Sequence, residues 1–131
     1  MTLETIDPPT LPTPTGYSQV VVASGQRLVF VAGQVALDPD GNVVSPGDPV
    51  GQARQAFANV RAALEAVGAT IADVTKVTWY VVGYSAELLP DLAAARREVF
   101  GDHAPASTLV GVTGLARPEY LVEAEAVAVL D

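Results

Sequence analysis

The sequence contains no cysteine and only one histidine, His103. Without thiols there is no disulfide framework, no cysteine nucleophile and no thiolate metal site. A single histidine excludes metal sites that need several imidazoles from one chain, and it disfavours a Ser-His-Asp type of acyl transfer. Sites made only of Asp and Glu need a spacing that no loop carries here. We therefore expect no metal and no cofactor, and we expect His103 to be a surface loop residue rather than part of a cleft.

Basic residues are also scarce, with seven Lys and Arg against 15 Asp and Glu and a net charge of −8. They are scattered along the chain rather than clustered. Affinity for nucleic acid depends largely on Lys and Arg that neutralise phosphates. We therefore expect no nucleic-acid partner, and RNA cleavage is disfavoured.

No apolar run approaches the roughly 18 residues of a membrane span. The first four residues lack the basic stretch and apolar core of a secretory signal. Both observations predict a cytoplasmic protein with no membrane partner. With 131 residues, half of them hydrophobic, the chain is expected to form a single domain with a sizeable core, residues 1–131. Residues 1–16 are expected to form an extended, proline-rich lead-in to that domain.

Strand-like segments surround two helical ones. The expected strands are residues 17–22, 28–32, 74–82 and two runs within 105–128, with a short return at 43–44 after the turn at 38–42. Asp48 and Pro49 are typical of a helix start, and Gly68 of a helix end. The apolar stripe of this first helix comprises Val50, Ala53, Phe57, Val60, Leu64 and Val67. The second helix has the stripe Leu88, Leu92, Ala95 and Val99 and ends at Gly101.

The last strand has two chemically different faces. Val122, Ala124, Ala126 and Ala128 form one face, which is small and apolar and suits close packing against helices. The other face carries Leu121, Glu123, Glu125 and Val127. Two carboxylates at i and i+2 point the same way, so at least one should reach a partner, a cleft or solvent. A solvated strand face is the simpler explanation of this pattern.

The element order predicts a mixed sheet with both helices on one face, because a βαβ crossover within one sheet is right-handed. The other face would then be uncovered, although much of it is apolar. A bare apolar sheet of this size is a liability in a monomer. We therefore expect a homo-oligomer.

Five motifs of the sequence, taken in order and spacing, resemble the RidA (YjgF-type) family. They are Gly-Tyr-Ser-Gln at 16–19, Val-Ala-Gly-Gln at 31–34, Gln-Ala-Arg-Gln-Ala-Phe-Ala-Asn-Val at 52–60, Pro-Ala-Ser-Thr-Leu-Val at 105–110 and Val-Glu-Ala-Glu-Ala at 122–126. The resemblance runs from about residue 5 to the C-terminus. It implies an α+β, chorismate-mutase-like fold, a homotrimer with a central barrel of sheets, and clefts between subunits that take a small molecule.

The resemblance also implies an activity. The best-known members hydrolyse 2-imino or enamine acids to 2-oxo acids and ammonia, although some family names refer to an endoribonuclease. In them an arginine binds the substrate carboxylate, a glutamate on the last strand positions water, and a tyrosine and the backbone near a Gly-Gln turn complete the cleft. Carried over, Tyr17 occupies the tyrosine position, Gly33 the turn and Glu123 the glutamate.

The carboxylate-binding arginine does not carry over, because Ser107 stands in its place and a shifted alignment offers only alanines. Two further departures are Ala93, where some members have a ligand-contacting asparagine, and Ala32, where a serine usually precedes the Gly-Gln pair. Losing a desolvated bidentate contact costs about 2–5 kcal/mol of binding. This departure puts the usual activity in question.

Arg117, in the turn between the last two strands, is the first candidate to replace the missing arginine. Arg96 and Arg97 are others, although surface salt bridges on the second helix explain them more simply. Ser107 and Thr108 add hydroxyls to the expected cleft. Two functions stay open: a hydrolase of imines or enamines in which Glu123 orients water, or a binding module that holds a small metabolite without turning it over. Chorismate mutase activity would be an analogy of fold alone.

Overall fold

The structure, a computed structural model, describes residues 2–131. Its strands are β1 (Thr2–Ile6), β2 (Val20–Ser24), β3 (Arg27–Val35), β4 (Val74–Val82), β5 (Ala106–Val112) and β6 (Val122–Leu130). The helices are α1 (Pro49–Glu65) and α2 (Leu89–Phe100), with short 3₁₀ turns at Ile71–Asp73 and Ala86–Leu88. The α+β class expected from the sequence is confirmed.

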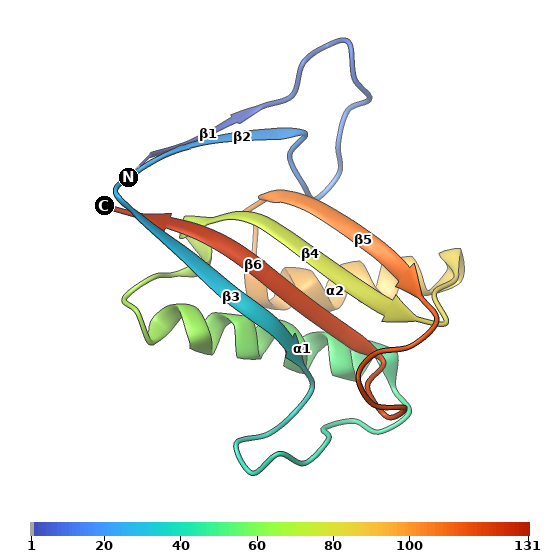
Figure 1. Ribbon diagram of the computed structural model, residues 1–131. Helices are drawn as coiled ribbons and strands as arrows, with labels where there is room; N and C mark the ends of the chain where they lie inside the picture. The colour runs from blue at the N-terminus through green and yellow to red at the C-terminus, as the bar shows by residue number, and fades with distance from the viewer. Residues whose placement is uncertain (1) are drawn as a thin grey trace.

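Four strands form the main sheet in the order β3-β6-β4-β5 (Figure 1). The last strand of the chain, β6, is therefore central, and it pairs antiparallel with both β3 and β4. Strand β5 pairs parallel with β4 and forms one edge of this sheet. Strands β1 and β2 form a separate antiparallel pair. The two strands of the 105–128 segment are thus separated by β4 in the sheet.

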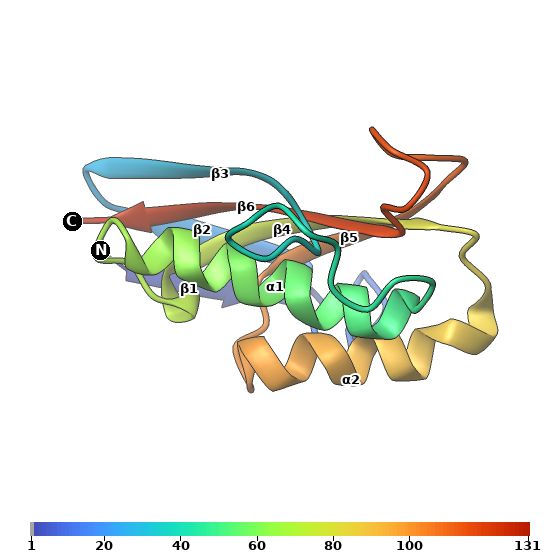
Figure 2. The same cartoon turned by 90° about the horizontal axis from the view of Figure 1, so that it is seen from below.

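Both helices cover the same face of the main sheet, and no helix of the described chain covers the other (Figure 2). The small face of β6 packs under them as predicted, with Val122, Ala124, Ala126 and Ala128 all buried. Phe57 of α1 holds the layers together through edge-to-face contacts with Trp79 and Phe100, at centroid distances of 5.1 and 5.5 Å. Rings in this geometry add about 0.5–1.5 kcal/mol per pair beyond their buried area.

Helix α1 begins and ends on local signals in the sequence. The Asp48 carboxylate accepts a hydrogen bond from the Val50 amide at 3.1 Å, and Pro49 occupies the first turn, where no amide partner is needed. At the other end Gly68 adopts φ +79°, which lets the Ala69 amide reach the Leu64 carbonyl at 2.9 Å. The helix itself ends at Glu65, so Val67 lies beyond the apolar stripe and is 47% exposed.

The N-terminal third departs most from the sequence prediction. Residues Thr2–Ile6, expected only as a lead-in, form β1 and pair with β2 from Thr2↔Ser24 to Ile6↔Val20. Strand β2 begins at Val20 rather than at residue 17, because residues 17–19 turn toward the start of β5. The expected return at 43–44 is a single bridge between Leu37 and Val43.

The uncovered sheet face exposes large apolar side chains. Leu28 and Phe30 of β3 are 63% and 72% exposed. Phe30 lies directly opposite Val127 of β6, so the two side chains share this face. None of the helices in residues 2–131 is long and apolar enough to cross a membrane.

A buried glutamine ties α1 to the loop before β6. Gln52 is fully buried, its amide nitrogen donates to the carbonyls of Ser45 and Glu119 at 3.3 and 3.1 Å, and its amide oxygen accepts from the Leu121 amide at 2.9 Å. These bonds satisfy backbone groups at the entry to β6, where Glu123 follows two residues later.

We predict that Gln52→Leu lowers the free energy of unfolding by about 2–3 kcal/mol, because it leaves backbone groups buried without partners. The measurement is urea denaturation at a fixed protein concentration. Gln26→Leu, at an exposed turn position, is the matched control and should change stability by less than about 0.5 kcal/mol. Equal effects of the two substitutions would contradict this role of Gln52.

Candidate functional site

The side chain of Glu123 lies directly on the backbone of Gly33. Strand β3 carries a bulge between Val31 and Gln34, which pair with Ala126 and Ala124 of β6. A Cβ atom added at Gly33 would collide with the Glu123 carboxylate and would lie 2.8 Å from its Cδ. Glycine at this bulge therefore leaves the space that the carboxylate occupies. Two residues that the sequence assigned to one cleft, Gly33 and Glu123, are in contact.

The second carboxylate of this strand, Glu125, is engaged by a tyrosine. The Tyr80 hydroxyl on β4 donates to Glu125 Oε1 at 2.5 Å. This hydrogen bond is the main cause that raises the pKa of Tyr80 above its ordinary value, followed by burial and by the charges of Glu125 and Glu123. Glu125 is thus held in place, whereas Glu123 has no hydrogen-bond partner among residues 2–131.

Ser107 and Thr108 point to opposite faces of the sheet. Thr108 lies opposite Thr78 in the β4–β5 ladder, and its hydroxyl accepts a hydrogen bond from Lys76 Nζ at 2.6 Å on the open face. Ser107 lies opposite Val77, which is buried in the core, so its side chain is on the helix side. Since β5 is an edge strand, Ser107 is at the border of the helix layer.

Tyr17 is held near the start of β5 by its neighbour Ser18. The Ser18 amide donates to the Pro105 carbonyl at 3.1 Å, and the Ser18 hydroxyl donates to the Ala104 carbonyl at 2.5 Å. Ser18 also forms an isolated parallel bridge with Ala106. The partly buried Tyr17 therefore belongs to the same corner of the molecule as Ser107.

The expected site residues thus form two groups that do not meet within one chain. Gly33 and Glu123 lie on the open face, and Tyr17 and Ser107 lie at the β5 edge. Strand β4 separates β5 from β6, which places Ser107 at least about 10 Å from Glu123 and on the other face. A cleft containing both groups needs two copies of the chain.

Arg117 and His103 take different positions from either group. Arg117 is exposed in the loop after β5, which projects away from the helix layer (Figure 2). Ser107 is near the other end of that strand, about 16 Å along it. The His103 ring is partly buried and donates through Nε2 to the Val74 carbonyl at 2.8 Å. His103 therefore joins the α2–β5 loop to β4, which the expectation of a plain surface residue did not include.

Arg96 was expected to form a surface salt bridge on α2, and this expectation is wrong. Its side chain is partly buried and joins no carboxylate of residues 2–131. The guanidinium instead contacts the backbone of Gly16, one residue before Tyr17. Burial, and secondarily the charge of Arg97, lowers the pKa of Arg96 from its ordinary value. The sequence pattern had no signal for this, because the contact joins residues 80 positions apart.

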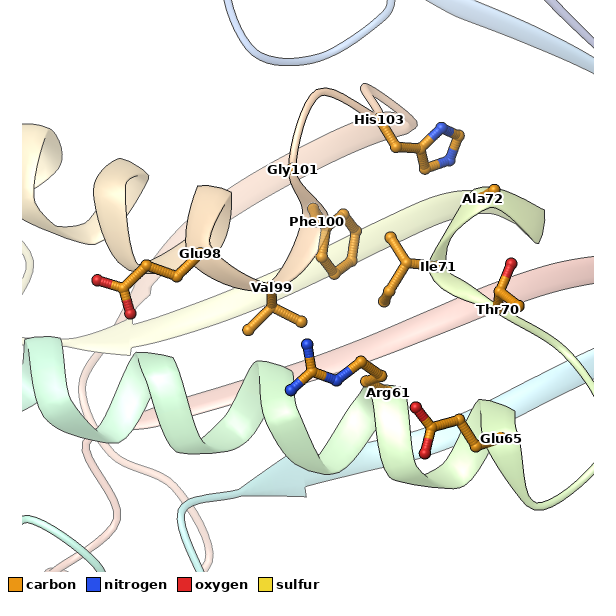
Figure 3. Close-up of a pocket in the computed structure, with 10 residues that line it drawn as sticks. All are labelled: Arg61, Glu65, Thr70, Ile71, Ala72, Glu98, Val99, Phe100, Gly101 and His103. Atoms are coloured by element: carbon orange, nitrogen blue, oxygen red, sulfur yellow. The ribbon is translucent and has the colours of Figure 1, made fainter.

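A separate groove of about 410 Å³ lies between the C-terminal halves of the two helices (Figure 3). Its floor is apolar, with Ile71, Val99 and Phe100, and its rim carries Arg61 and Glu65. His103 lines this groove, but none of the residues expected to form the cleft does. Within residues 2–131, no group of three His, Cys, Asp or Glu side chains could hold a metal ion.

We predict that Gly33→Ala turns the Glu123 carboxylate away from its present position while leaving the fold intact, because the flexible end of Glu123 can yield to the new methyl group. A crystal structure of the variant would show a different Glu123 rotamer, and the melting temperature would change little. Gly114→Ala is the control, since a Cβ there meets open space. An unmoved Glu123 in Gly33→Ala would refute the prediction.

Comparison with known proteins places these features in one family. The family model described as Endoribonuclease L-PSP matches residues 9–130. A RutC family protein of Pyrococcus horikoshii is 37% identical over 121 residues, which cover 89% of this chain and 90% of that protein. The 2-iminobutanoate/2-iminopropanoate deaminase of Dermatophagoides farinae is 32% identical over 127 residues, covering 96% and 95%.

Comparison with solved structures leads to the same family. The crystal structure of YyfB from Yersinia pestis, a Rid-family protein of unknown function, matches 99% of this chain and 100% of its own with a TM-score of 0.92 at 36% identity. The resemblance read from the five sequence motifs is confirmed, and so is the expected sheet with two helices on one face. The chain therefore belongs to the endoribonuclease L-PSP family, the family of RidA and YjgF.

Proposed function

We propose that this protein is a homotrimeric hydrolase of small 2-imino or enamine acids, with its active sites in clefts between subunits. The observation that carries the proposal is the Glu123 carboxylate, held over Gly33 on the uncovered sheet face without a hydrogen-bond partner among residues 2–131. A carboxylate in this state is free to accept a proton from water. The named activity of the Dermatophagoides farinae relative supports the choice of substrate.

The chemistry assigned to Glu123 is general base catalysis. The carboxylate takes a proton from water while the water oxygen forms a bond to the imine carbon of the substrate. The resulting tetrahedral carbon carries both a hydroxyl and an amino group. The substrate reacts as its protonated imine, so Glu123 still holds the proton from water at this point. It returns that proton to the amino nitrogen, the C–N bond breaks, and the hydroxyl proton passes to the departing ammonia, so that a 2-oxo acid and an ammonium ion leave. Backbone donors near Gly33 or Ser107 would hold the oxygen, and Tyr17, Thr108 and Arg117 would line the cleft.

Two features support self-association of the chain. Leu28 and Phe30 leave a large apolar area exposed on the open face, and such areas in soluble proteins are usually interfaces. The two groups of site residues are separated within one protomer, so a partner that covers the open face can bring its own β5 edge toward Glu123. A closed ring of three such contacts is the family's arrangement and is proposed for this chain.

A second candidate is a binding module with the same clefts. It is favoured by Ser107, which the sequence resemblance aligns with the family's carboxylate-binding arginine. A serine hydroxyl offers a neutral hydrogen bond in place of a charge-assisted bidentate pair. In this alternative the clefts hold a small metabolite, and Glu123 makes contact with it without activating water.

The hydrolase proposal predicts accelerated loss of 2-imino acids. An amino-acid oxidase would generate them from alanine, leucine or phenylalanine, and semicarbazide would trap what survives. Adding the protein should lower the semicarbazone formed, and Glu123→Gln should reduce this activity by about 100-fold or more. Glu65→Gln, with the same charge change on an exposed helix position, should match the unaltered protein. No loss of semicarbazone with any precursor would leave the binding module as the function.

The assembly predicts a mass in solution of three times the 13.5 kDa chain, measured by light scattering. Phe30→Asp should lower this mass, because it would bury a charge in the apolar interface. Val67→Asp, at a similarly exposed apolar position after α1, should keep the mass of the unaltered protein. A monomeric mass of the unaltered protein at micromolar concentration would overturn the proposed assembly.

A further inference from the structure

A groove of about 460 Å³ lies between α2 and the segment that precedes Tyr17. Gly16, Ala93 and Arg96 line it. Ala93 and Arg96 are three residues apart and so lie on one face of the helix. Gly16 adopts φ +76°, and a Cβ there would collide with Arg96 Nη2 and lie 3.6 Å from Cζ. Glycine at this position therefore permits both the turn and the close approach of the guanidinium.

Arg96 is a partly desolvated cation without a counter-charge in the described chain. A contrast within the same helix layer makes this clear, since Arg54 forms an ion pair with Glu98 at 2.6 Å. The pKa of Arg54 is raised by that partner, whereas the pKa of Arg96 is lowered by its burial. Removing an arginine from water without a partner is unfavourable. An anion bound in the groove would offset that cost.

The groove lies near the start of β5, where the resemblance to the family leads one to expect an arginine at position 107. Hydrogen bonds of Ser18 to the carbonyls of Ala104 and Pro105 hold the Gly16–Tyr17 segment beside the start of β5. The side chain of Ser107 is on the helix side of the sheet, and α2 packs on that same side (Figures 1 and 2). An arginine at position 107 would reach this corner from strand β5. Arg96 reaches the same corner from helix α2.

We propose that Arg96 binds the carboxylate of the ligand and takes over the role that Ser107 cannot perform. This inference rests on the proposed function and adds to it the residue of this chain that recognises the carboxylate of the substrate. The planar guanidinium can hold a carboxylate through two parallel N–H···O bonds. The small Ala93 lines the groove and leaves room for the ligand.

The test measures binding of 2-oxobutanoate and of its uncharged amide by isothermal titration calorimetry or ligand-observed NMR. The unaltered protein should bind the acid at least tenfold more tightly than the amide. Arg96→Gln should weaken binding of the acid at least tenfold and remove the preference for the acid over the amide. Arg96→Lys should weaken binding of the acid several-fold, because lysine keeps the charge but not the planar guanidinium that makes two parallel hydrogen bonds. Arg61→Gln, an exposed arginine on α1, is the charge-matched control and should bind as the unaltered protein does.

Several results would overturn the inference. The first is that the unaltered protein does not bind 2-oxobutanoate, and the second is that Arg96→Gln binds it as tightly as the unaltered protein. The third is that Arg117→Gln loses binding of 2-oxobutanoate while Arg96→Gln keeps it. If Arg96→Gln fails to assemble, Arg96→Lys decides, and unchanged binding by that variant counts against the role. The inference and the hydrolase proposal fail separately. Arg96-dependent binding without imine hydrolysis refutes only the hydrolase, and hydrolysis with an unchanged kcat/KM in Arg96→Gln refutes only the role of Arg96.

Discussion

The alternation of side chains along β6 is the constraint on which the rest of this structure depends. Because successive residues of a strand point to opposite faces, one face of β6 presents Val122, Ala124, Ala126 and Ala128 to the helices. The other face then has to present Glu123 and Glu125 to the uncovered side. A slip of one residue would bury two carboxylates under α1, which no counter-charge there would offset. The central position of β6, between β3 and β4, makes this register the one that both neighbouring strands must match.

The small residues of β6 also determine how close the helices approach the sheet. Alanine side chains let α1 pack tightly, so its aromatic residue Phe57 can reach both Trp79 and Phe100. Gln52 then satisfies the backbone of the loop that leads into β6. The core and the position of Glu123 are therefore coupled, since the same strand supplies both.

Electrostatics distinguishes the two sides of the molecule. The open face gathers Glu123, Glu125 and the Tyr80 hydroxyl, which donates to Glu125, and this hydrogen bond raises the pKa of Tyr80. On the helix side, the guanidinium of Arg96 lies against Gly16, the residue before Tyr17. Among the arginines of residues 2–131, Arg96 is the one that is partly buried, and it has no carboxylate partner there. A cleft between two copies would combine a base from one face with a cation from the other edge.

Local signals in the sequence determined much of the fold. Asp48, Pro49 and Gly68 marked α1, and the β-branched run Val74–Val82 marked β4 with its observed bounds. The two faces of β6 followed from alternation alone. Five motifs in order and spacing, those around Gly33 and Glu123 among them, indicated the family. These features depend on residues within one turn or one strand, where spacing and backbone preference act directly.

Tertiary structure decided what depends on distant residues. Strand β1 forms because β2 pairs with it. The proline-rich sequence of residues 1–16 contained no local pattern that predicted this pairing. The insertion of β6 between β3 and β4 separates Ser107 from Glu123, which sequence order could not reveal. Arg96 was read as a surface residue because its helical pattern is amphipathic, yet the turn at Gly16 covers it. Contacts between segments 80 residues apart follow from chain topology and packing, and local sequence patterns do not encode them.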